Sequence, residues 1–175
     1  MFVTGCVMLA DRPKGVGMKQ KYTRFQIGVE ALCVLALVGM VVFIAVSWGQ
    51  LPDQIPAHYN FAGEIDRWGS KNEFLLFPGI GIFLYLLLTV VSSFPQIWNM
   101  PAKVTEENKG DVYRCTKDML LVMKAEMILV FFAITYLTTK CTAIPWVYLA
   151  GMLVAIFGTL IYMSVRISRV ARQKK

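Results

Sequence analysis

Four long apolar stretches divide the chain, at residues 27–48, 74–94, 120–139 and 144–165. Polar and charged residues concentrate between these stretches and at both ends. A helix rises 1.5 Å per residue, so roughly 20 apolar residues cross the ~30 Å hydrocarbon core of a bilayer. Lipid offers no water to the backbone, whereas a helix satisfies its own N–H and C=O groups. The pattern therefore predicts a transmembrane helix at each stretch.

The expected fold class is an all-α integral membrane protein, with four transmembrane helices in an antiparallel bundle. The connection at 140–143 is so short that the third and fourth helices should be neighbours. An ordered extracytoplasmic loop is expected between the first two helices. We divide the chain into a basic N-terminal segment (1–24), a single transmembrane domain (25–166) and a basic tail (167–175).

The orientation of the helices follows from their flanking Lys and Arg residues. Five precede the first predicted helix, the three connections carry two, four and one in turn, and five follow Val165. Short segments rich in Lys and Arg remain in the cytoplasm. We therefore expect a multi-pass protein of the cytoplasmic membrane, with both termini inside and residues 51–73 outside.

Composition supports a membrane protein and argues against other classes. Hydrophobic residues make up 57% of the chain, whereas soluble domains contain about 45–50%. The net charge of +7 comes from residues beside apolar stretches, and no nucleic-acid-reading motif is present, so we expect no nucleic-acid partner. The four cysteines form no C-x-x-C pair, which argues against a zinc site or a disulfide framework.

The segment 51–73, with the sequence LPDQIPAHYNFAGEIDRWGSKNE, is the most distinctive polar part of the chain. Pro52 and Pro56 restrict the backbone where the segment begins. Ser70 and Glu73 have the spacing of a capping box and open directly onto the second apolar stretch. These features predict a defined loop rather than a flexible linker.

This segment resembles a bacterial membrane family known as domain of unknown function 1648 (DUF1648). The resemblance is carried by LPDQIP and then by His58, Asn60, Gly63, Asp66, Trp68, Gly69, Ser70 and Lys71. The same domain forms the start of SdpI-type toxin-immunity proteins. The resemblance thus implies a membrane protein of uncharacterised function, with immunity to a membrane-active peptide as the role it suggests.

Polar side chains of the loop are its candidate site. We predict that His58, Asn60, Asp66 and Lys71 form one cluster that closes the outer end of the bundle and presents a recognition surface. Hydrogen bonds from His58 and Asn60 to loop backbone are the alternative. A metal site would use His58, Glu64 and Asp66, but one histidine without cysteine or an H-E-x-x-H motif is a weak ligand set. We expect no metal and no cofactor.

Three charged residues lie within the apolar stretches: Glu30, Lys124 and Glu126. Such charges are costly in lipid and suggest function, here a proton or ion relay. The simpler interpretation pairs Glu30 with Lys124, because their depths match. Glu126 lies two residues from Lys124 and so on a different face of the helix, which leaves it in need of another partner or a proton.

Small residues recur every four positions in the last apolar stretch, at Gly151, Ala155 and Thr159. Stripes of this kind let helices approach closely. We expect this one to pack inside the bundle, and a homo-oligomer contact is the alternative.

The favoured function is a non-enzymatic, toxin-immunity-like or envelope-recognition protein that acts through residues 51–73. Its partners would be the lipid bilayer and an envelope peptide or membrane protein. The alternatives are a small membrane binding or transport component that uses the intramembrane charges, and a metal-dependent membrane enzyme built on His58. No Ser/His/Asp order or phosphate-binding glycine loop supports catalysis.

Overall fold

The structure, a computed structural model, describes residues 21–100 and 102–173. Most of the predicted basic N-terminal segment and the last two residues of the predicted tail lie outside this range.

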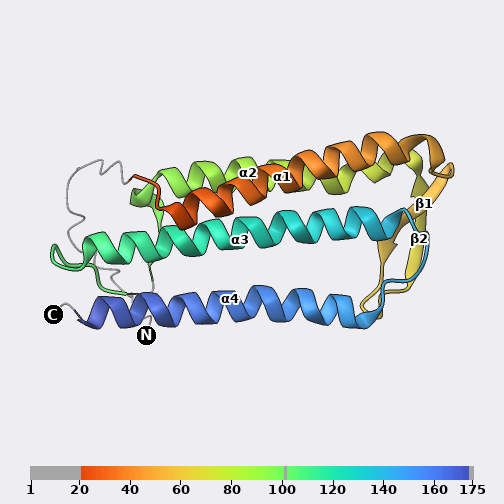
Figure 1. Ribbon diagram of the computed structural model, residues 1–175. Coiled ribbons are helices and arrows are strands. Elements are labelled where there is room, and N and C mark those ends of the chain that lie inside the picture. The colour runs from red at the N-terminus through yellow and green to blue at the C-terminus, as the bar shows by residue number, and fades with distance from the viewer. Residues whose placement is uncertain (1–20, 101, 174–175) are drawn as a thin grey trace, which may run out of the picture.

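Within these residues, four helices are long and apolar enough to span a membrane, as predicted. They are α1 (Arg24–Ser47), α2 (Leu76–Ser93), α3 (Lys109–Thr138) and α4 (Trp146–Gln173), and short 3-10 turns η1 (Trp48–Gln50), η2 (Lys71–Leu75) and η3 (Pro95–Ile97) flank them. Successive helices run in opposite directions, and α3 lies between the α1–α2 pair and α4 (Figure 1). The chain is therefore a multi-pass helical membrane protein.

The segment between α1 and α2 contains a β-hairpin, which the predicted all-α class did not include. Strands β1 (Gln54–Tyr59) and β2 (Ile65–Ser70) pair antiparallel, with Pro56 opposite Trp68 and His58 opposite Arg67. The register shifts on either side of His58. Proline, glycine and irregular pairing remove the alternation from which a strand is usually predicted.

The hairpin turn is built around Asn60. Its side-chain oxygen accepts hydrogen bonds from the backbone N–H groups of Ala62 (2.9 Å) and Glu64 (3.0 Å). Gly63 follows with a φ of 80°, a left-handed conformation that glycine adopts without strain. Asn60 is thus a turn residue, a role that Asn side chains commonly take.

Backbone contacts fix the hairpin across one end of the bundle (Figure 1). At its base, Lys71 N donates to Asp53 O at 2.9 Å. At its tip, Ile144 N donates to Gly63 O at 2.7 Å, which ties the hairpin to the connection before α4. Between these points Ile55 is fully buried against Leu51 and Phe74. We call this end of the bundle the hairpin end.

Polar side chains of α3 reach each of the other helices. Gln26 Nε2 of α1 donates to Asp118 Oδ1 at 2.7 Å. Lys124 Nζ donates to Thr89 Oγ1 of α2 at 3.1 Å, and Thr159 of α4 donates to Glu126 Oε1 at 2.5 Å. By contrast, only 6% of the residues in the most apolar stretch of α4 are buried by the rest of the protein. Most side chains of α4 are therefore left to contact lipid.

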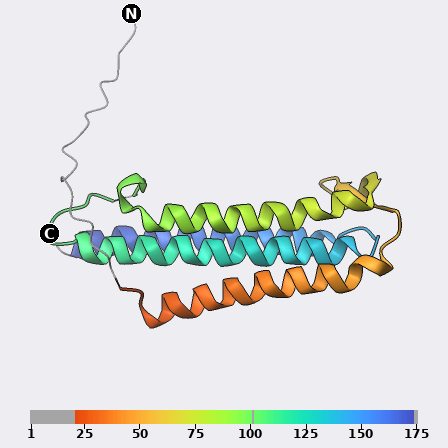
Figure 2. The ribbon, with the colours of Figure 1, turned by 90° about the horizontal axis from the view of Figure 1, so that it is seen from above.

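The hairpin and the α2–α3 connection lie at opposite ends of the bundle (Figures 1 and 2). In a cysteine-free background, Gln54→Cys and Glu106→Cys place labels at exposed positions on these two ends. We expect an impermeant thiol reagent to modify position 54 in intact cells and position 106 only after lysis. The reverse result would contradict the orientation inferred from the Lys and Arg count.

The hairpin tip should be sensitive to substitution at Gly63. A Cβ atom there would clash with the carbonyl oxygen of Ile144, and the left-handed backbone would cost a further ~1–2 kcal/mol. We expect Gly63→Ala to lower the unfolding temperature in detergent. Gly79→Ala is the matched control, because a Cβ atom on this α2 residue meets nothing within 4 Å. Equal unfolding temperatures for the two variants would show that the tip does not stabilise the fold.

Candidate functional site

The hairpin carries an exposed pair formed by His58 and Asp66. His58 Nδ1 lies 2.6 Å from Asp66 Oδ1, and their side chains are 64% and 41% exposed. A carboxylate accepts hydrogen bonds, so Nδ1 is the donating nitrogen of the ring. Nε2 makes no bond to the described part of the chain and is available to a partner outside it.

The other two members of the predicted cluster lie elsewhere. Asn60 Nδ2 donates to Glu64 Oε2 at 2.9 Å, beside the turn. Lys71 Nζ lies 5.0 Å from the centre of the Trp48 ring, where a cation is attracted by the aromatic face. Of the predicted cluster, the structure shows the contact between His58 and Asp66, while Asn60 bonds to loop backbone, as the alternative interpretation expected. Asn60 takes part in the hairpin turn, and Lys71 contacts Trp48 of η1.

A second ion pair on the hairpin was missed in the sequence. Arg67 Nη1 lies 2.9 Å from Glu73 Oε2, while Glu73 Oε1 accepts from Ser70 N at 3.1 Å. The predicted capping box is present, although it opens the 3-10 turn η2 rather than α2 itself. Arg67 lies in β2 and Glu73 in η2, so the change of direction from the strand into the 3-10 turn brings the two side chains together, and no sequence periodicity indicates this contact.

Two large aromatic side chains face away from the hairpin core. Trp68 is 50% exposed and Phe61, in the turn, is fully exposed. His58 lies on the paired strand and Arg67 next to Trp68 in the same strand. The hairpin thus presents an aromatic and charged surface, which we call the hairpin surface and define by His58, Phe61, Asp66, Arg67 and Trp68.

The three residues considered as zinc ligands, His58, Glu64 and Asp66, do not form one group. His58 and Asp66 are together, but the Glu64 carboxylate is bonded to Asn60 instead. No group of three or more His, Cys, Asp or Glu side chains suited to a metal occurs in residues 21–100 and 102–173.

Tyr59 marks a polar contact between the hairpin and the end of α3. Burial raises the pKa of the Tyr59 hydroxyl, and the neighbouring Thr138 hydroxyl offsets part of this effect. Both hydroxyl oxygens are fully buried, and neither makes a well-formed hydrogen bond within the described residues. The hairpin thus brings two buried hydroxyl groups together at the end of α3 without a well-formed hydrogen bond between them.

Within the bundle, Glu30 and Lys124 form the ion pair that their matched depth predicted. Lys124 Nζ lies 2.8 Å and 2.6 Å from the two carboxylate oxygens of Glu30, and the Lys124 side chain is 1% exposed. Tyr85 completes the group, because its hydroxyl donates to Glu30 Oε1 at 3.1 Å and its ring lies 4.7 Å from Nζ. Together with the bond to Thr89, these contacts join α1, α2 and α3.

A second polar group lies nearer the opposite end from the hairpin. Asp118 accepts from Gln26 and lies 3.9 Å from Arg166 of α4. Beside it, Lys117 Nζ lies 3.7 Å from the centre of the Tyr22 ring. Lys117 and Asp118 precede the third apolar stretch and so fall in a predicted connection, whereas α3 begins at Lys109 and includes both of them.

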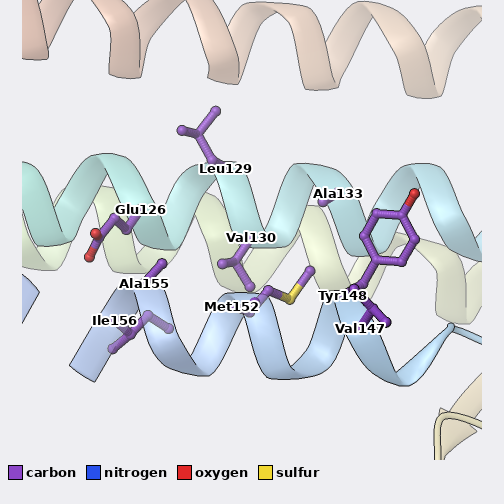
Figure 3. Close-up of a pocket in the computed structure, with 10 residues that line it drawn as sticks. Glu126, Leu129, Val130, Ala133, Val147, Tyr148, Met152, Ala155 and Ile156 are labelled. Carbon is purple, nitrogen blue, oxygen red and sulfur yellow. The ribbon is translucent and has the colours of Figure 1, made fainter. Parts of the chain in front are cut away.

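Glu126 faces α4 and has an incomplete set of partners. Its Oε1 accepts from Thr159, but its Oε2 is fully buried and makes no hydrogen bond within the described residues. Gly151 and Ala155 line the α3–α4 cavity next to it, so the predicted small-residue stripe faces α3. The cavity measures about 380 Å³ (Figure 3) and is lined by Glu126, Leu129, Val130, Ala133, Val147, Tyr148, Gly151, Met152, Ala155 and Ile156.

These features define a multi-pass helical membrane protein whose bundle is covered at one end by a hairpin. The family described as "Domain of unknown function (DUF1648)" matches residues 35–82, from within α1 through the hairpin to the first turns of α2. The resemblance to DUF1648 noted in the sequence is thereby confirmed for those residues.

An "Uncharacterized protein" of Archaeoglobus fulgidus is 29% identical over 93 residues, which cover 45% of this chain. The match spans about half of that relative, 51% of its length. Since the relative is archaeal, the similarity extends beyond the bacteria to which the sequence resemblance pointed. No solved structure matches the chain.

Glu30 and Lys124 should each stabilise the bundle only while the other is present. Removing one partner of a buried pair typically costs about 3–5 kcal/mol, because the other charge is left uncompensated. We expect Glu30→Gln and Lys124→Met each to lower thermal stability in detergent, and the double variant to lose less than their sum.

Lys71→Met is the matched control for this cycle, because Lys71 lies at the hairpin end and does not contact Glu30. Its effect should add to that of Glu30→Gln. Strict additivity between Glu30→Gln and Lys124→Met would contradict the ion pair.

Proposed function

We propose that this protein is a non-enzymatic recognition protein of the cytoplasmic membrane, with a role like toxin immunity. Its hairpin surface would bind an envelope peptide or a membrane-protein partner outside the cell. The observation that carries the proposal is a fixed hairpin that buries Ile55 but leaves Phe61 and Trp68 exposed on a segment that also carries two ion pairs.

Rigidity supports binding. The hairpin is held at its base by the Lys71–Asp53 backbone bond and at its tip by the Ile144–Gly63 bond. A surface that is already ordered loses little conformational entropy when a partner binds. Trp and Arg, which Trp68 and Arg67 supply here, are the residues that most often dominate binding energy at protein interfaces.

A membrane anchor is the competing explanation for the exposed aromatic residues, since Trp is enriched at bilayer interfaces. The charge pairs favour a partner instead. Asp66 and Arg67 precede Trp68 in β2, and the pairs that they form with His58 and Glu73 offer directional donors and acceptors that an apolar anchor does not need.

Catalysis has less support than recognition. Asp66 orients the His58 ring as in many catalytic dyads, but within the described residues no Ser, Thr or Cys side chain bonds to that histidine. The immunity-like role rests on the DUF1648 domain and on the resemblance of the segment to SdpI-type immunity proteins.

Variants of the hairpin surface test the proposal in a strain that lacks the gene and is challenged with a membrane-active peptide toxin. We expect Trp68→Ala and Asp66→Asn to reduce survival relative to the complemented strain, at unchanged membrane levels of the protein. Loss of a central interface Trp commonly costs 2 kcal/mol or more, roughly a 30-fold drop in affinity.

Matched controls carry the same substitutions outside the hairpin surface. Trp146→Ala changes an exposed Trp at the start of α4, and Asp53→Asn changes an exposed carboxylate just before β1. Both controls should survive like the wild type. Equal survival with and without the gene, or equal loss in variants and controls, would contradict recognition by the hairpin surface.

A further inference from the structure

The outer face of α4 changes from apolar to basic towards the C-terminal end of the helix. Ile161 and Val165 are 65% and 43% exposed. Arg169 follows Val165 by one turn, Arg172 follows Arg169 by almost another, and both arginines are exposed. Side chains three or four residues apart are neighbours on a helix surface. These four side chains therefore form one continuous stripe, which we call the α4 stripe.

The α4 stripe points away from the rest of the bundle. The buried residues of α4 are Met163, Ile167 and Ala171, and the last two pack against the first turns of α3. Val165 and Arg169 each lie two residues from Ile167, which is about 200° around a helix of 3.6 residues per turn. The stripe thus faces the membrane, and it runs to the end of the bundle opposite the hairpin (Figure 1).

The positive charge of the α4 stripe is not balanced by the described part of the chain. Helix α4 contains no Asp or Glu. Between α2 and the third apolar stretch the acidic residues lie on the connection and on α3, at Glu106, Glu107, Asp111 and Asp118. Arg166 of α4 lies 3.9 Å from Asp118. Arg169 and Arg172 form no ion pair within residues 21–100 and 102–173.

The position of the stripe shows which kind of molecule meets it. The last apolar stretch ends at Val165, so Arg169 lies about 6 Å further along the helix. The headgroup layer adds roughly 5–7 Å to each side of the hydrocarbon core, which places this guanidinium among lipid phosphates. A guanidinium binds phosphate oxygens through paired hydrogen bonds. A protein or nucleic acid in the aqueous phase would meet the arginines but not Ile161 or Val165, whereas a phospholipid supplies both a phosphate and an acyl chain.

We infer that the α4 stripe binds an anionic phospholipid. Its phosphate accepts hydrogen bonds from Arg169 and Arg172, and its acyl chain lies along Ile161 and Val165. Charge selects this class of lipid, because a zwitterionic headgroup carries its own cation beside the phosphate, whereas an anionic headgroup leaves the phosphate charge for the arginines. This site goes beyond the proposed recognition by the hairpin surface and does not depend on it, since the two lie at opposite ends of the bundle.

Photolabelling of the full chain in phosphatidylcholine nanodiscs tests the inference. The probes are phosphatidylglycerol and phosphatidylcholine that carry the same diazirine in an acyl chain. We expect phosphatidylglycerol to label residues 157–165 about fivefold more than phosphatidylcholine, as the attraction of one basic side chain to an anionic surface implies. The double variant Arg169→Gln/Arg172→Gln should bring this ratio close to one. Its labelling by phosphatidylcholine should stay at the wild-type level, which shows that the variant folds.

The matched control is Lys103→Gln/Arg114→Gln, which removes the same charge from exposed positions near this end of the bundle but not from α4. Its ratio should equal that of the wild type. Equal labelling by the two lipids in the wild type, or an unchanged ratio in the α4 variant, would overturn the inference. A fall of the same size in the control would overturn it too, because net charge would then be the cause. Competition by glycerol phosphate as strong as that by unlabelled phosphatidylglycerol would replace the lipid with a free phosphate ligand.

Discussion

The ammonium of Lys124 is the group on which the packing of three helices depends. A lysine with 1% exposure has no water to solvate it, so the surrounding helices must provide every donor–acceptor contact. Glu30 comes from α1, Thr89 and Tyr85 from α2, and together they fix how these helices pack on α3. Apolar packing alone could not specify that arrangement in lipid, because the surrounding acyl chains are as apolar as the side chains.

The two ends of the bundle are held together differently. Away from the hairpin, polar groups around Asp118 connect α3 with α1 and α4. At the hairpin end, the strands cover the bundle and the contacts are largely apolar, around Ile55 and Phe74. The DUF1648 match covers residues 35–82, and so includes the hairpin with the adjoining parts of α1 and α2 but none of α3. The domain therefore supplies the hairpin surface, while the polar interior and the α3–α4 cavity require the rest of the chain.

Hydropathy predicted the four helices, because backbone satisfaction in lipid leaves few other structures for a long apolar stretch. Depth matching predicted the Glu30–Lys124 pair for a similar reason, since a charge in lipid must find a partner at its own level. The hairpin was missed because Pro56 and Gly69 interrupt the residue pattern of its strands. The partners of Asn60 and Lys71 were not predicted, because strand register cannot be derived from the order of polar residues. The contacts of Asp118 were not predicted, because hydropathy places the charged first turns of the long helix α3 in a connecting loop.

The hydrogen bond between Ile144 and Gly63 has a mechanical consequence. Among the other helices α4 packs mainly against α3, and its first turn follows directly after the residue that the hairpin tip holds. The tip thus connects the segment that carries the outward-facing aromatic residues to the start of α4. A load applied to the hairpin is transmitted along the backbone to the one helix that has the least support from its neighbours.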